Sequence, residues 1–354
     1  ASDVYKRQGG GILNNGTLEL IDCEITGNIA SGSHGGGIYN GGSGSLTIIN
    51  GSVTNNTAPL IGGGIAILSG TAVNLQNVTI SGNRSGSNGG AIYTQAAALS
   101  LNHVTVANNS AENFGGGIYK SSSGGTLHIE NSIIANNVAS APSLNDFFGS
   151  VTTRAGVNFI GGPAGASGLG TLGTDYLTGD PLLSPLGYYG GPTQTMHPLV
   201  GSPAIDPVGT TNPGGTDQRG FNRLVGSTVD IGAVEVGPVT LVTDTGDGAG
   251  TSGTLRNAIT NATTPGTVIR FAASFNGEPA DEIDTASVLA LTTGQAIFLD
   301  ASDRPGGVTV AGTGASRLFT VNSGSALAAH SLTVTGGNSG TDAGGLFNDG
   351  GTLT

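Results

Sequence analysis

The chain has 354 residues, of which 65 are glycine and only 10% are charged. Its net charge of −12, from 11 Lys and Arg against 23 Asp and Glu, excludes the basic stripe on which nucleic-acid-binding proteins depend. The single cysteine excludes an internal disulfide, and the sequence contains no apolar run of membrane length and no recognisable signal peptide.

Residues 1–8 do not share the pattern of the residues that follow, and we exclude them from the fold as a non-native-looking tail. From residue 9 onward a short motif of two or three small residues and an isoleucine recurs. The isoleucines are Ile12, Ile38, Ile65, Ile92 and Ile118. They lie 26, 27, 27 and 26 residues apart. A constant period in this range is typical of a solenoid, in which each repeat is one coil stacked on the last.

Three columns of aliphatic residues recur in these coils. The first holds Leu18, Leu46, Val73, Leu99 and Leu127, the second Leu20, Ile48, Leu75, Leu101 and Ile129, and the third Ile25, Val53, Ile80, Val106 and Ile134. One polar position separates the first two columns, and this alternation is the signature of a strand with one buried face. The pattern predicts an all-β fold, with residues 9–161 forming a right-handed parallel β-helix of five to six coils.

Two polar columns fall where the chain must turn. One holds Asn28, Asn56, Asn83, Asn109 and Asn137, and the other Asp22, Asn50, Asn77, His103 and Asn131. Stacked amides can hydrogen-bond along the solenoid axis, and asparagine tolerates the left-handed backbone of a tight bend. We therefore interpret both columns as structural, with an asparagine ladder along the axis, rather than as ligands for another molecule.

Residues 162–236 form a Gly/Pro-rich region whose sequence motifs differ from those of the repeats. This region is predicted to be an irregular closing module between two solenoid units. Its blocks include Asp180-Pro181-Leu182-Leu183, Gly190-Gly191-Pro192-Thr193, Gly201-Ser202-Pro203-Ala204-Ile205-Asp206 and Val229-Asp230-Ile231-Gly232-Ala233. This series resembles the closing module of bacterial surface β-helix proteins called choice-of-anchor Q proteins. The resemblance implies a secreted or cell-surface location.

Residues 237–354 are predicted to form a second β-helix. Residues 254–262 carry apolar side chains at helical spacing after Thr254 or Ser252 as the N-cap, which predicts a helix that covers the open end of this solenoid. The segment resembles the opening of CSLREA-type β-helices, although the usual cysteine is missing. Strands are expected at 268–271, 288–291, 296–299, 308–310, 318–321 and 332–334.

The end of the chain repeats its beginning. Gly344-Gly345-Leu346-Phe347-Asn348 restates the opening motif, and Gly351-Thr352-Leu353-Thr354 matches Gly16-Thr17-Leu18-Glu19. Because the sequence stops inside a predicted strand, we expect the second solenoid to be truncated at its C-terminus and the chain to be a fragment of a longer protein.

Pectin-lyase-like solenoids include polysaccharide lyases and hydrolases, so catalysis is the alternative to test. Hydrolases need two facing carboxylates, and lyases need clustered acids for calcium together with a base. No outward column holds acids on adjacent coils: Glu19 and Glu24 are followed by Thr47 and Ser52, and Asn102 precedes Glu130. We therefore expect no catalytic, cofactor or metal site on the first solenoid.

Charged residues gather instead in the closing module, at Asp206, Asp217, Arg219, Arg223, Asp230 and Glu235. We interpret them as ion pairs and turn hydrogen bonds that tie the module together, with a ligand or calcium pocket as the alternative. The Asp244-Thr245-Gly246-Asp247-Gly248 loop could also bind calcium, but it lacks EF-hand spacing, and Asx turns explain it at least as well.

One outward column, next to the buried isoleucines, contains Tyr39, Tyr93 and Tyr119. These tyrosines are the candidate ligand-binding residues, as a platform for sugar rings, although aromatic cross-strand pairing would explain them too. The Gly-Gly-x-Ile motif also resembles the repeats of polymorphic outer-membrane adhesins. We expect a non-enzymatic extracellular or bacterial cell-surface protein, an adhesin or structural stalk whose partners are surface glycans or host extracellular matrix. The alternative is a polysaccharide lyase or glycoside hydrolase on the same fold, and the oligomeric state stays open.

Overall fold

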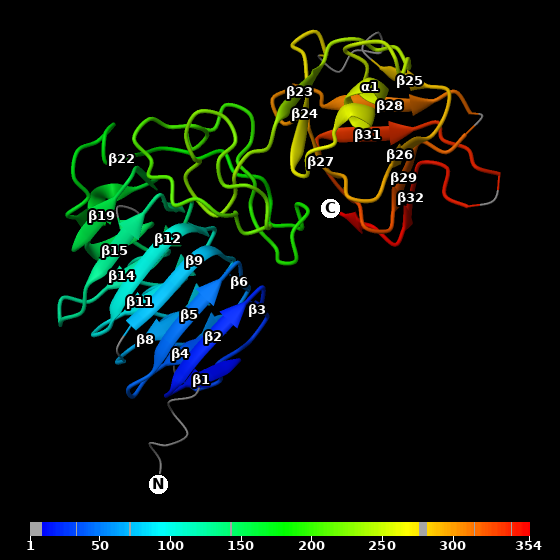
Figure 1. Ribbon diagram of the computed structural model, residues 1–354. Coiled ribbons are helices and arrows are strands. Elements are labelled where there is room, and N and C mark those ends of the chain that lie inside the picture. The colour runs from blue at the N-terminus through cyan, green and yellow to red at the C-terminus, as the bar shows by residue number, and fades with distance from the viewer. Residues whose placement is uncertain are drawn as a thin grey trace. The chain divides into compact units, whose positions relative to one another are not determined.

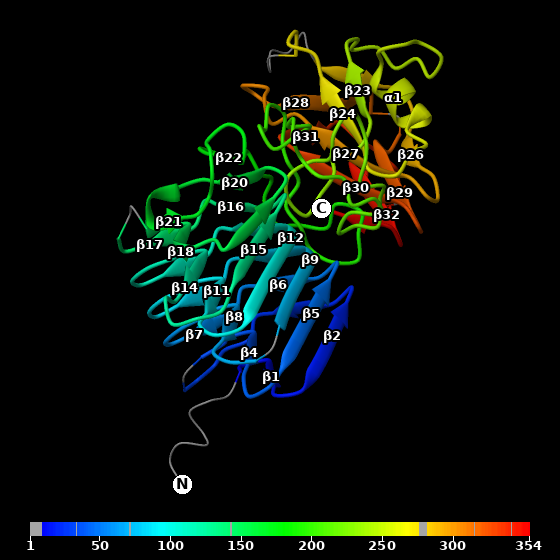
Figure 2. The same cartoon turned by 60° about the vertical axis from the view of Figure 1, so that its left-hand side comes forward.

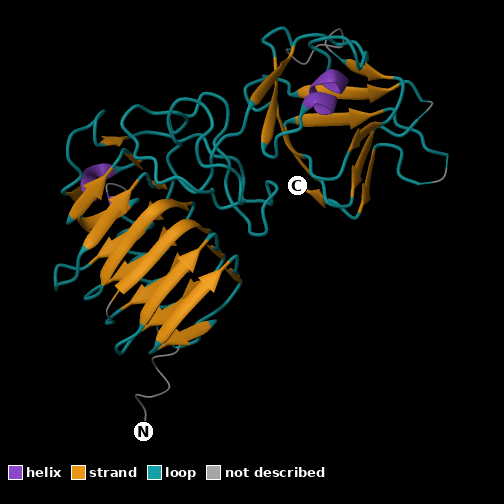
Figure 3. Cartoon of the chain, in the orientation of Figure 1, coloured by secondary structure: helices purple, strands orange, loops and turns teal. Residues whose placement is uncertain are grey.

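The computed structural model describes residues 9–32, 34–70, 72–141, 144–275, 282–314, 316–340 and 342–354. The chain divides into two compact units. Unit one consists of residues 1–186, 192–198 and 202–235, and unit two of residues 187–191, 199–201 and 236–354. Regular structure is almost entirely strand, and the helical segments described are η3 (Pro163–Gly165) and α1 (Leu255–Asn261) (Figure 3).

Unit one is a stack of parallel strands (Figures 1 and 2). One sheet runs β1 (Ile12–Asn14), β4 (Ile38–Asn40), β8 (Ile65–Ile67), β11 (Ile92–Thr94), β14 (Ile118–Lys120), β18 (Phe147–Ser150) and β21 (Ala166–Ser167). A second contains β2 (Thr17–Ile21), β3 (Glu24–Thr26), β5 (Ser45–Ile49), β6 (Ser52–Thr54), β9 (Ala72–Ser81), β12 (Ala98–Ala107), β15 (Leu127–Glu130), β16 (Ile133–Ala135), β19 (Thr153–Ala155), β20 (Asn158–Ile160) and β22 (Tyr176–Leu177). A short third sheet, which the sequence did not predict, holds β7 (Thr57–Ala58), β10 (Arg84–Ser85), β13 (Ser110–Ala111) and β17 (Val138–Ala139).

The strand registers confirm the predicted columns. Ile38 is paired with both Ile12 and Ile65, and Val73 is paired with both Leu46 and Leu99. From the second coil onward these side chains are at most 1% exposed and form one continuous core. The aliphatic residues therefore stack directly above one another, and the predicted parallel β-helix is confirmed.

The small residues of the repeated motif have different structural roles. Gly35 has a φ of 65°, a left-handed conformation that glycine adopts at low cost. Gly36 has an ordinary φ, but a Cβ there would lie 2.3 Å from the carbonyl oxygen of Gly63 and 2.6 Å from backbone atoms of Thr57. The first glycine thus makes the turn, and the second lets two walls of the coil approach each other more closely than a methyl group would allow.

The predicted asparagine ladder runs through the interior of the coils. Each Nδ2 donates to the Oδ1 of the next rung over 2.9 Å, in the order Asn28, Asn56, Asn83, Asn109 and Asn137. Asp146 ends the ladder by accepting from both the Asn137 side chain, at 2.9 Å, and the Asn137 backbone, at 2.8 Å. Burial raises the pKa of the Asp146 carboxyl, while its hydrogen bonds from Asn137 and Gly162 act in the opposite direction.

The second polar column forms the predicted left-handed bend. Asp22, Asn50, Asn77, His103 and Asn131 have φ values between 42° and 54°. A second left-handed column, not predicted, directly precedes the ladder at Gly27, Asn55, Gly82, Asn108 and Asn136. Asparagine and glycine are the residues that adopt this conformation most readily, which explains their abundance at the corners of the coils.

Unit two contains a second set of parallel sheets. Their strands are β23 (Val239–Val242), β24 (Thr267–Phe271), β27 (Ala296–Asp300), β30 (Ala326–His330) and β33 (Thr352–Leu353), then β25 (Ile283–Thr285), β28 (Val308–Gly312) and β31 (Leu332–Thr335), and finally β26 (Leu289–Leu291), β29 (Phe319–Asn322) and β32 (Leu346–Asp349). Helix α1 begins after Thr254, whose side chain accepts from the Asn257 backbone, and it buries Leu255, Ala258 and Ile259 in the core of this unit. Gln295 donates to the last-turn carbonyls of α1 at Ile259 and Ala262, which ties the helix to the strands.

The ladder makes a prediction about stability. Replacing Asn83 with alanine removes the acceptor for the backbone N–H of Asn56 and for one of the two N–H groups of its side-chain amide, whose other N–H keeps the Ile25 carbonyl. Since an unsatisfied buried donor costs about 1–3 kcal/mol, Asn83→Ala should lower the free energy of unfolding of unit one by at least about 2 kcal/mol. Urea unfolding followed by circular dichroism measures this. Asn74→Ala, at an exposed position of β9, is the matched control, and an equal loss in both variants would contradict the role of the ladder.

Candidate functional site

The structure brings two of the three candidate tyrosines together. Tyr93 and Tyr119 lie opposite each other on β11 and β14, with ring centroids 5.2 Å apart and an interplanar angle of 5°. Phe148 of β18 continues the stack, 5.1 Å from Tyr119, and Phe114 stacks on Phe148 at 5.4 Å. We call these four residues the aromatic strip. It crosses three successive coils on the outer face of the first sheet.

Tyr39 lies apart from the strip. In the register of the sheet Ala66 separates it from Tyr93, so no ring bridges the two. The Tyr39 side chain is only 6% exposed and stacks on His34 with the centroids 6.3 Å apart. Of the three tyrosines proposed from the sequence, Tyr93 and Tyr119 are thus partly exposed neighbours, whereas Tyr39 is a buried residue at another place on the sheet.

The geometry of the strip determines which ligand contacts it offers. The faces of Tyr93 and Tyr119 are turned toward each other and so cover one another, and both side chains are half-buried. Phe114, 37% exposed, is the most open ring. Burial, with a smaller contribution from Tyr119, raises the pKa of the Tyr93 phenol, so this hydroxyl stays neutral and can donate a hydrogen bond. The strip therefore combines an apolar ridge with phenolic donors.

A second site feature consists of residues 192–198 and 202–235, two stretches of the predicted closing module that belong to unit one and that we call the covering segment. It lies along the side of the solenoid and does not add coils to it. It covers an outward column whose members, in register, are Glu24, Ser52, Thr79, Thr105, Ile133 and Phe159. This column changes from charged to apolar along the axis.

The contacts of the covering segment follow the chemistry of the column that it covers. At the first coil the Gln194 backbone donates to Glu24 at 2.6 Å, and at the third coil Thr79 bonds both Thr195, at 2.8 Å, and Gln218, at 2.6 Å. At the last coils Ala204 and Ile231 pack on Ile133 and Phe159 in a small apolar cluster. Polar groups thus contact polar ones and apolar groups contact apolar ones over the whole length of the segment.

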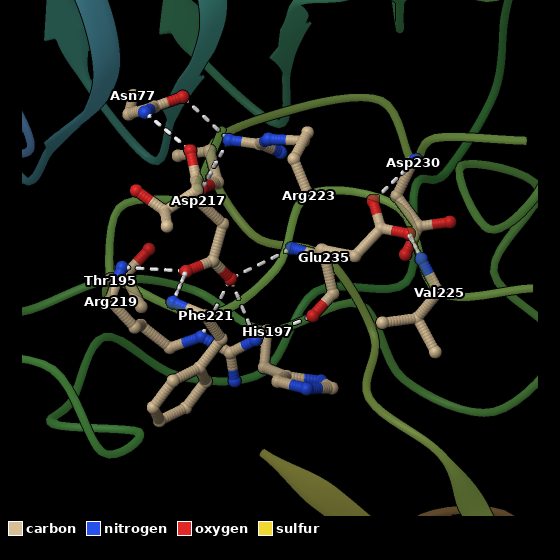
Figure 4. Close-up of polar contacts among 12 residues, drawn as sticks. Asn77, Thr195, His197, Asp217, Arg219, Phe221, Arg223, Val225, Asp230 and Glu235 are labelled. Atoms are coloured by element: carbon tan, nitrogen blue, oxygen red, sulfur yellow. Dashed lines mark hydrogen bonds and ion pairs between the residues drawn. The ribbon is translucent and has the colours of Figure 1, made fainter. Parts of the chain in front are cut away.

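Apart from the half-buried Asp206, the charged residues of the covering segment are buried, and they are hydrogen-bonded within the chain (Figure 4). Asp217 accepts the Arg219 guanidinium at 2.7 and 2.9 Å, and its carboxylate also accepts the backbone N–H groups of Phe221 and Glu235. The Arg219 guanidinium lies 4.7 Å from the centroid of the Phe221 ring, a cation–π contact. This arrangement supports ion pairing and turn formation, as interpreted from the sequence, rather than a ligand pocket.

Arg223 joins the covering segment to the left-handed bend of the solenoid. Its guanidinium donates to the Asn77 side chain at 2.6 Å and to the carbonyls of Gly232 and Ala233 (Figure 4). The neighbouring bend residue, His103, bonds Asn102 through Nδ1 at 2.6 Å and Asn131 through Nε2 at 3.1 Å. Because the Asn131 amide donates, Nε2 accepts, and the imidazole is neutral with its proton on Nδ1. Burial and the nearby Arg223 lower the pKa of His103 to about 2.

Glu235 and Asp230 place two carboxyl groups in the same buried region. The Glu235 carboxyl accepts the backbone N–H groups of Val225 and Asp230, each at 2.9 Å. Burial, together with the Asp230 carboxylate, raises the pKa of Glu235 to about 8. Glu235 therefore carries a proton in the folded protein at neutral pH, which keeps two like charges from being buried side by side.

The arrangement of the acidic residues bears on catalysis and metal binding. In the registers of the described strands no acidic residue faces another acidic residue: Glu19 faces Thr47, Glu130 faces Asn102 and Ala155, and Asp300 faces Arg270 and His330. Within the described ranges no three His, Cys, Asp or Glu side chains cluster as metal ligands would.

The loop considered as a calcium site has a structural explanation. Asp244 accepts the Gly246 backbone N–H at 2.8 Å in an Asx turn, and Asp247 pairs with the Arg256 guanidinium at 2.7 Å. Both carboxylates are thus engaged within the chain, and Asp247 also accepts the Ala286 backbone N–H. This geometry supports the interpretation of the loop as an Asx turn rather than as a cation site.

Sequence reasoning missed several residues of these two features. Phe148 follows the last regular repeat, so counting in steps of 27 does not reach it, and Phe114 precedes the glycine motif instead of following it. The polar contacts of Thr79 and Thr105 with the covering segment produce no pattern that recurs with the period of the coils. One signal was present: Ile133 and Phe159 are apolar at outward positions of the second sheet, and an outward apolar pair on neighbouring coils indicates a covering element.

His103 predicts how acid affects unit one. The unfolded side chain takes up a proton below about pH 6.5, but the folded one does so only near pH 2. The contribution of the buried, neutral His103 to the free energy of unfolding is therefore complete above pH 6.5. It falls by roughly 1.4 kcal/mol per pH unit as the pH decreases below this value. His103→Asn, which suits the left-handed bend, should flatten this slope in urea titrations at pH 3.5–7. The half-exposed His128→Asn is the control, and an unchanged slope in His103→Asn would refute the assignment.

The raised pKa of Glu235 predicts that the free energy of unfolding of unit one decreases as the pH rises. Its folded pKa of about 8 lies above the ordinary value of 4.5, so its contribution is complete below pH 4.5 and is lost as the pH rises through 8. Glu235→Gln loses one acceptor, which should cost about 1–3 kcal/mol at pH 4.5, but its stability should no longer decrease between pH 4.5 and 8. Thermal unfolding across this range measures the effect. The exposed Glu112→Gln serves as control, and a decrease as steep as in the unmodified chain would contradict the raised pKa.

Comparison with known proteins adds one match. The profile of the family described as "Right handed beta helix region" matches residues 2–163, the first solenoid. Searches of curated proteins and of solved structures each gave no significant match. Among the described residues no helix has the length and apolar character that crossing a membrane requires. The stacked parallel sheets give the chain an all-β, parallel β-helix fold, and the family match, which covers less than half of the chain, supports the right-handed sense of the first solenoid.

Proposed function

We propose that this protein is a non-enzymatic, extracellular or bacterial cell-surface β-helix that acts as an adhesin or structural stalk, with surface glycans or extracellular matrix as its ligands. The observation that carries the proposal is the aromatic strip, since Tyr93, Tyr119, Phe148 and Phe114 form a partly exposed ridge across three coils. Aromatic residues with a polar tip are enriched at binding surfaces because they supply contact area at a low entropic cost.

The strip suits an extended ligand better than a small one. Successive rings follow the coil spacing of about 4.8 Å, so a polymer lying along the axis would meet a similar contact at each step. The half-buried Tyr93 and Tyr119 would offer phenolic hydroxyl groups to sugar hydroxyls, and the more open Phe114 ring would offer an apolar surface to sugar C–H groups. Each contact is weak, and affinity would come from their number.

The separation of acidic side chains favours binding over catalysis. A glycosidase needs two carboxyl groups about 5–10 Å apart across the scissile bond. The buried carboxyl pair, Glu235 and Asp230, is 1% exposed on each side chain and accepts backbone hydrogen bonds, which leaves it no access to substrate. We therefore expect no unsaturated products when the chain is incubated with acidic polysaccharides and calcium; their appearance would support the lyase alternative.

The ligand proposal predicts the effect of removing the rings. The double substitution Tyr93→Ser and Tyr119→Ser should lower binding on a glycan array by roughly tenfold, since each aromatic contact is worth about 0.5–1.5 kcal/mol. The matched control, Tyr93→Phe with Tyr119→Phe, preserves the stack and loses only the hydroxyl groups. Thermal unfolding of both variants separates loss of binding from loss of structure. Full binding by a folded serine variant would exclude the strip as the ligand site.

A further inference from the structure

The basic residues at the surface of unit one are paired within the chain. After residue 8 this unit contains five Lys and Arg against 12 Asp and Glu. The Arg84 guanidinium lies 2.9 Å from the Glu112 carboxylate, and the Arg154 guanidinium lies 3.2 Å from the carboxylate of Asp175. Each of these two arginines is therefore neutralised by an acidic side chain of the same unit.

The other three basic residues of unit one are buried. Arg219 and Arg223 are at most 5% exposed and are hydrogen-bonded within the chain. Lys120 follows Tyr119 on β14 but is only 7% exposed, because neighbouring residues of a strand point to opposite faces. Its Nζ donates to two carbonyl groups of the loop that follows β14, at 3.3 and 3.4 Å. The basic residue that is closest in sequence to the aromatic strip is thus turned away from the strip.

Uncharged polar groups lie beside the strip at Phe114. Asn113 directly precedes Phe114, and its side-chain amide donates to the Ser87 hydroxyl at 3.1 Å. The Asn88 side chain accepts the backbone N–H of Phe114 at 3.3 Å. Asn113 is exposed, and Ser87 and Asn88 are half-buried. Amides and hydroxyls can exchange hydrogen bonds with sugar hydroxyls, but they offer no opposite charge to a carboxylate or a sulfate group.

The excess charge of unit one is negative. The 12 acidic residues exceed the five basic ones even when Glu235 carries a proton, and the net charge of the whole chain is −12. The Debye length at physiological ionic strength is about 8 Å, so charges on neighbouring coils still repel an anionic ligand. Each ionised group of such a ligand would also lose water without meeting an unpaired cation. An uncharged sugar has neither of these costs.

We infer that the aromatic strip selects uncharged polysaccharides and rejects those that carry carboxylate or sulfate groups. This inference rests on the proposed function, because it names the chemical class of ligand for the same site. The rings supply apolar contact, the polar groups beside Phe114 supply hydrogen bonds, and the pairing or burial of every Lys and Arg of unit one after residue 8 supplies the discrimination.

Polysaccharides in matched neutral and anionic pairs test the selectivity. The pairs are hydroxyethyl and carboxymethyl cellulose, dextran and dextran sulfate, and methyl-esterified and de-esterified homogalacturonan, printed on one microarray. The full chain should bind the neutral member of at least one pair, and it should bind the anionic partner at least about tenfold more weakly in about 0.15 M salt. Added salt should increase the residual binding of the anionic member, because it screens repulsion. Tyr93→Ser with Tyr119→Ser should lose the neutral binding.

The outcomes separate this inference from the proposed function. Equal binding of both members of a pair, or anionic binding that weakens as salt is added, overturns the selectivity and leaves the proposed function in place. Neutral binding that persists in the folded double serine variant shows that another surface binds the glycan. A chain that binds no member of any pair overturns the selectivity and the proposed function together.

A charge-addition variant tests the physical cause of the selectivity. Asn113→Lys places an unpaired cation next to Phe114 and should raise the ratio of anionic to neutral binding roughly threefold, the size of an exposed ion pair. The matched control is Asn74→Lys, which adds the same charge at an exposed position of β9 in the second sheet and should leave this ratio unchanged. Equal increases in both variants would show that net charge acts without regard to position. That result, or no increase with Asn113→Lys, would refute the inference.

Discussion

The structure depends on one constraint, the in-register stacking of every coil on the preceding one. The asparagine ladder shows how strict this constraint is, because each rung donates to the next through Nδ2 and accepts from the previous one through Oδ1. A shift of one residue would leave buried amides without partners, at about 1–3 kcal/mol each. The ladder also explains the small residues of the repeat: a Cβ at Gly37 would lie 3.0 Å from the Asn56 amide. Sequence motif, turn and register thus have one physical cause.

This constraint is also why the fold could be read from the sequence. A stacked coil requires the same kind of side chain at the same place in each repeat, so the aliphatic columns and the two polar columns repeat visibly. The left-handed bend was predictable for the same reason, since Asn50, Asn77 and Asn131 share a conformation that few residues adopt. Even Asp22 and His103, the two members of that column that are not asparagine, have the backbone conformation of their asparagine neighbours, because the position is determined by the coil and not by the residue.

The covering segment could not be predicted in this way. Its contacts join residues far apart in the chain, such as Thr79 with Gln218 and Glu24 with Gln194, and each pair occurs once. Its charged groups resemble a site in the sequence because acids and arginines cluster there. The structure shows instead that Asp217 and Arg219 satisfy each other and the surrounding backbone. A cluster of charges indicates function only when its hydrogen-bonding capacity is left open, and here it is used to fasten a loop-rich segment to a regular surface.

The function of this solenoid is therefore to be sought in positions that stacking leaves free. Inward columns are uniform because the core requires it, whereas outward columns vary from coil to coil. One outward column changes from the charged Glu24 to the apolar Phe159, and the covering segment packs on it. Another changes from Ala66 to Tyr93 and Tyr119 and stays partly exposed. The neighbouring rings of this column stabilise the sheet by cross-strand pairing. They also leave partly exposed apolar surface at a position that the core does not constrain, and the proposal of a binding role starts from this surface.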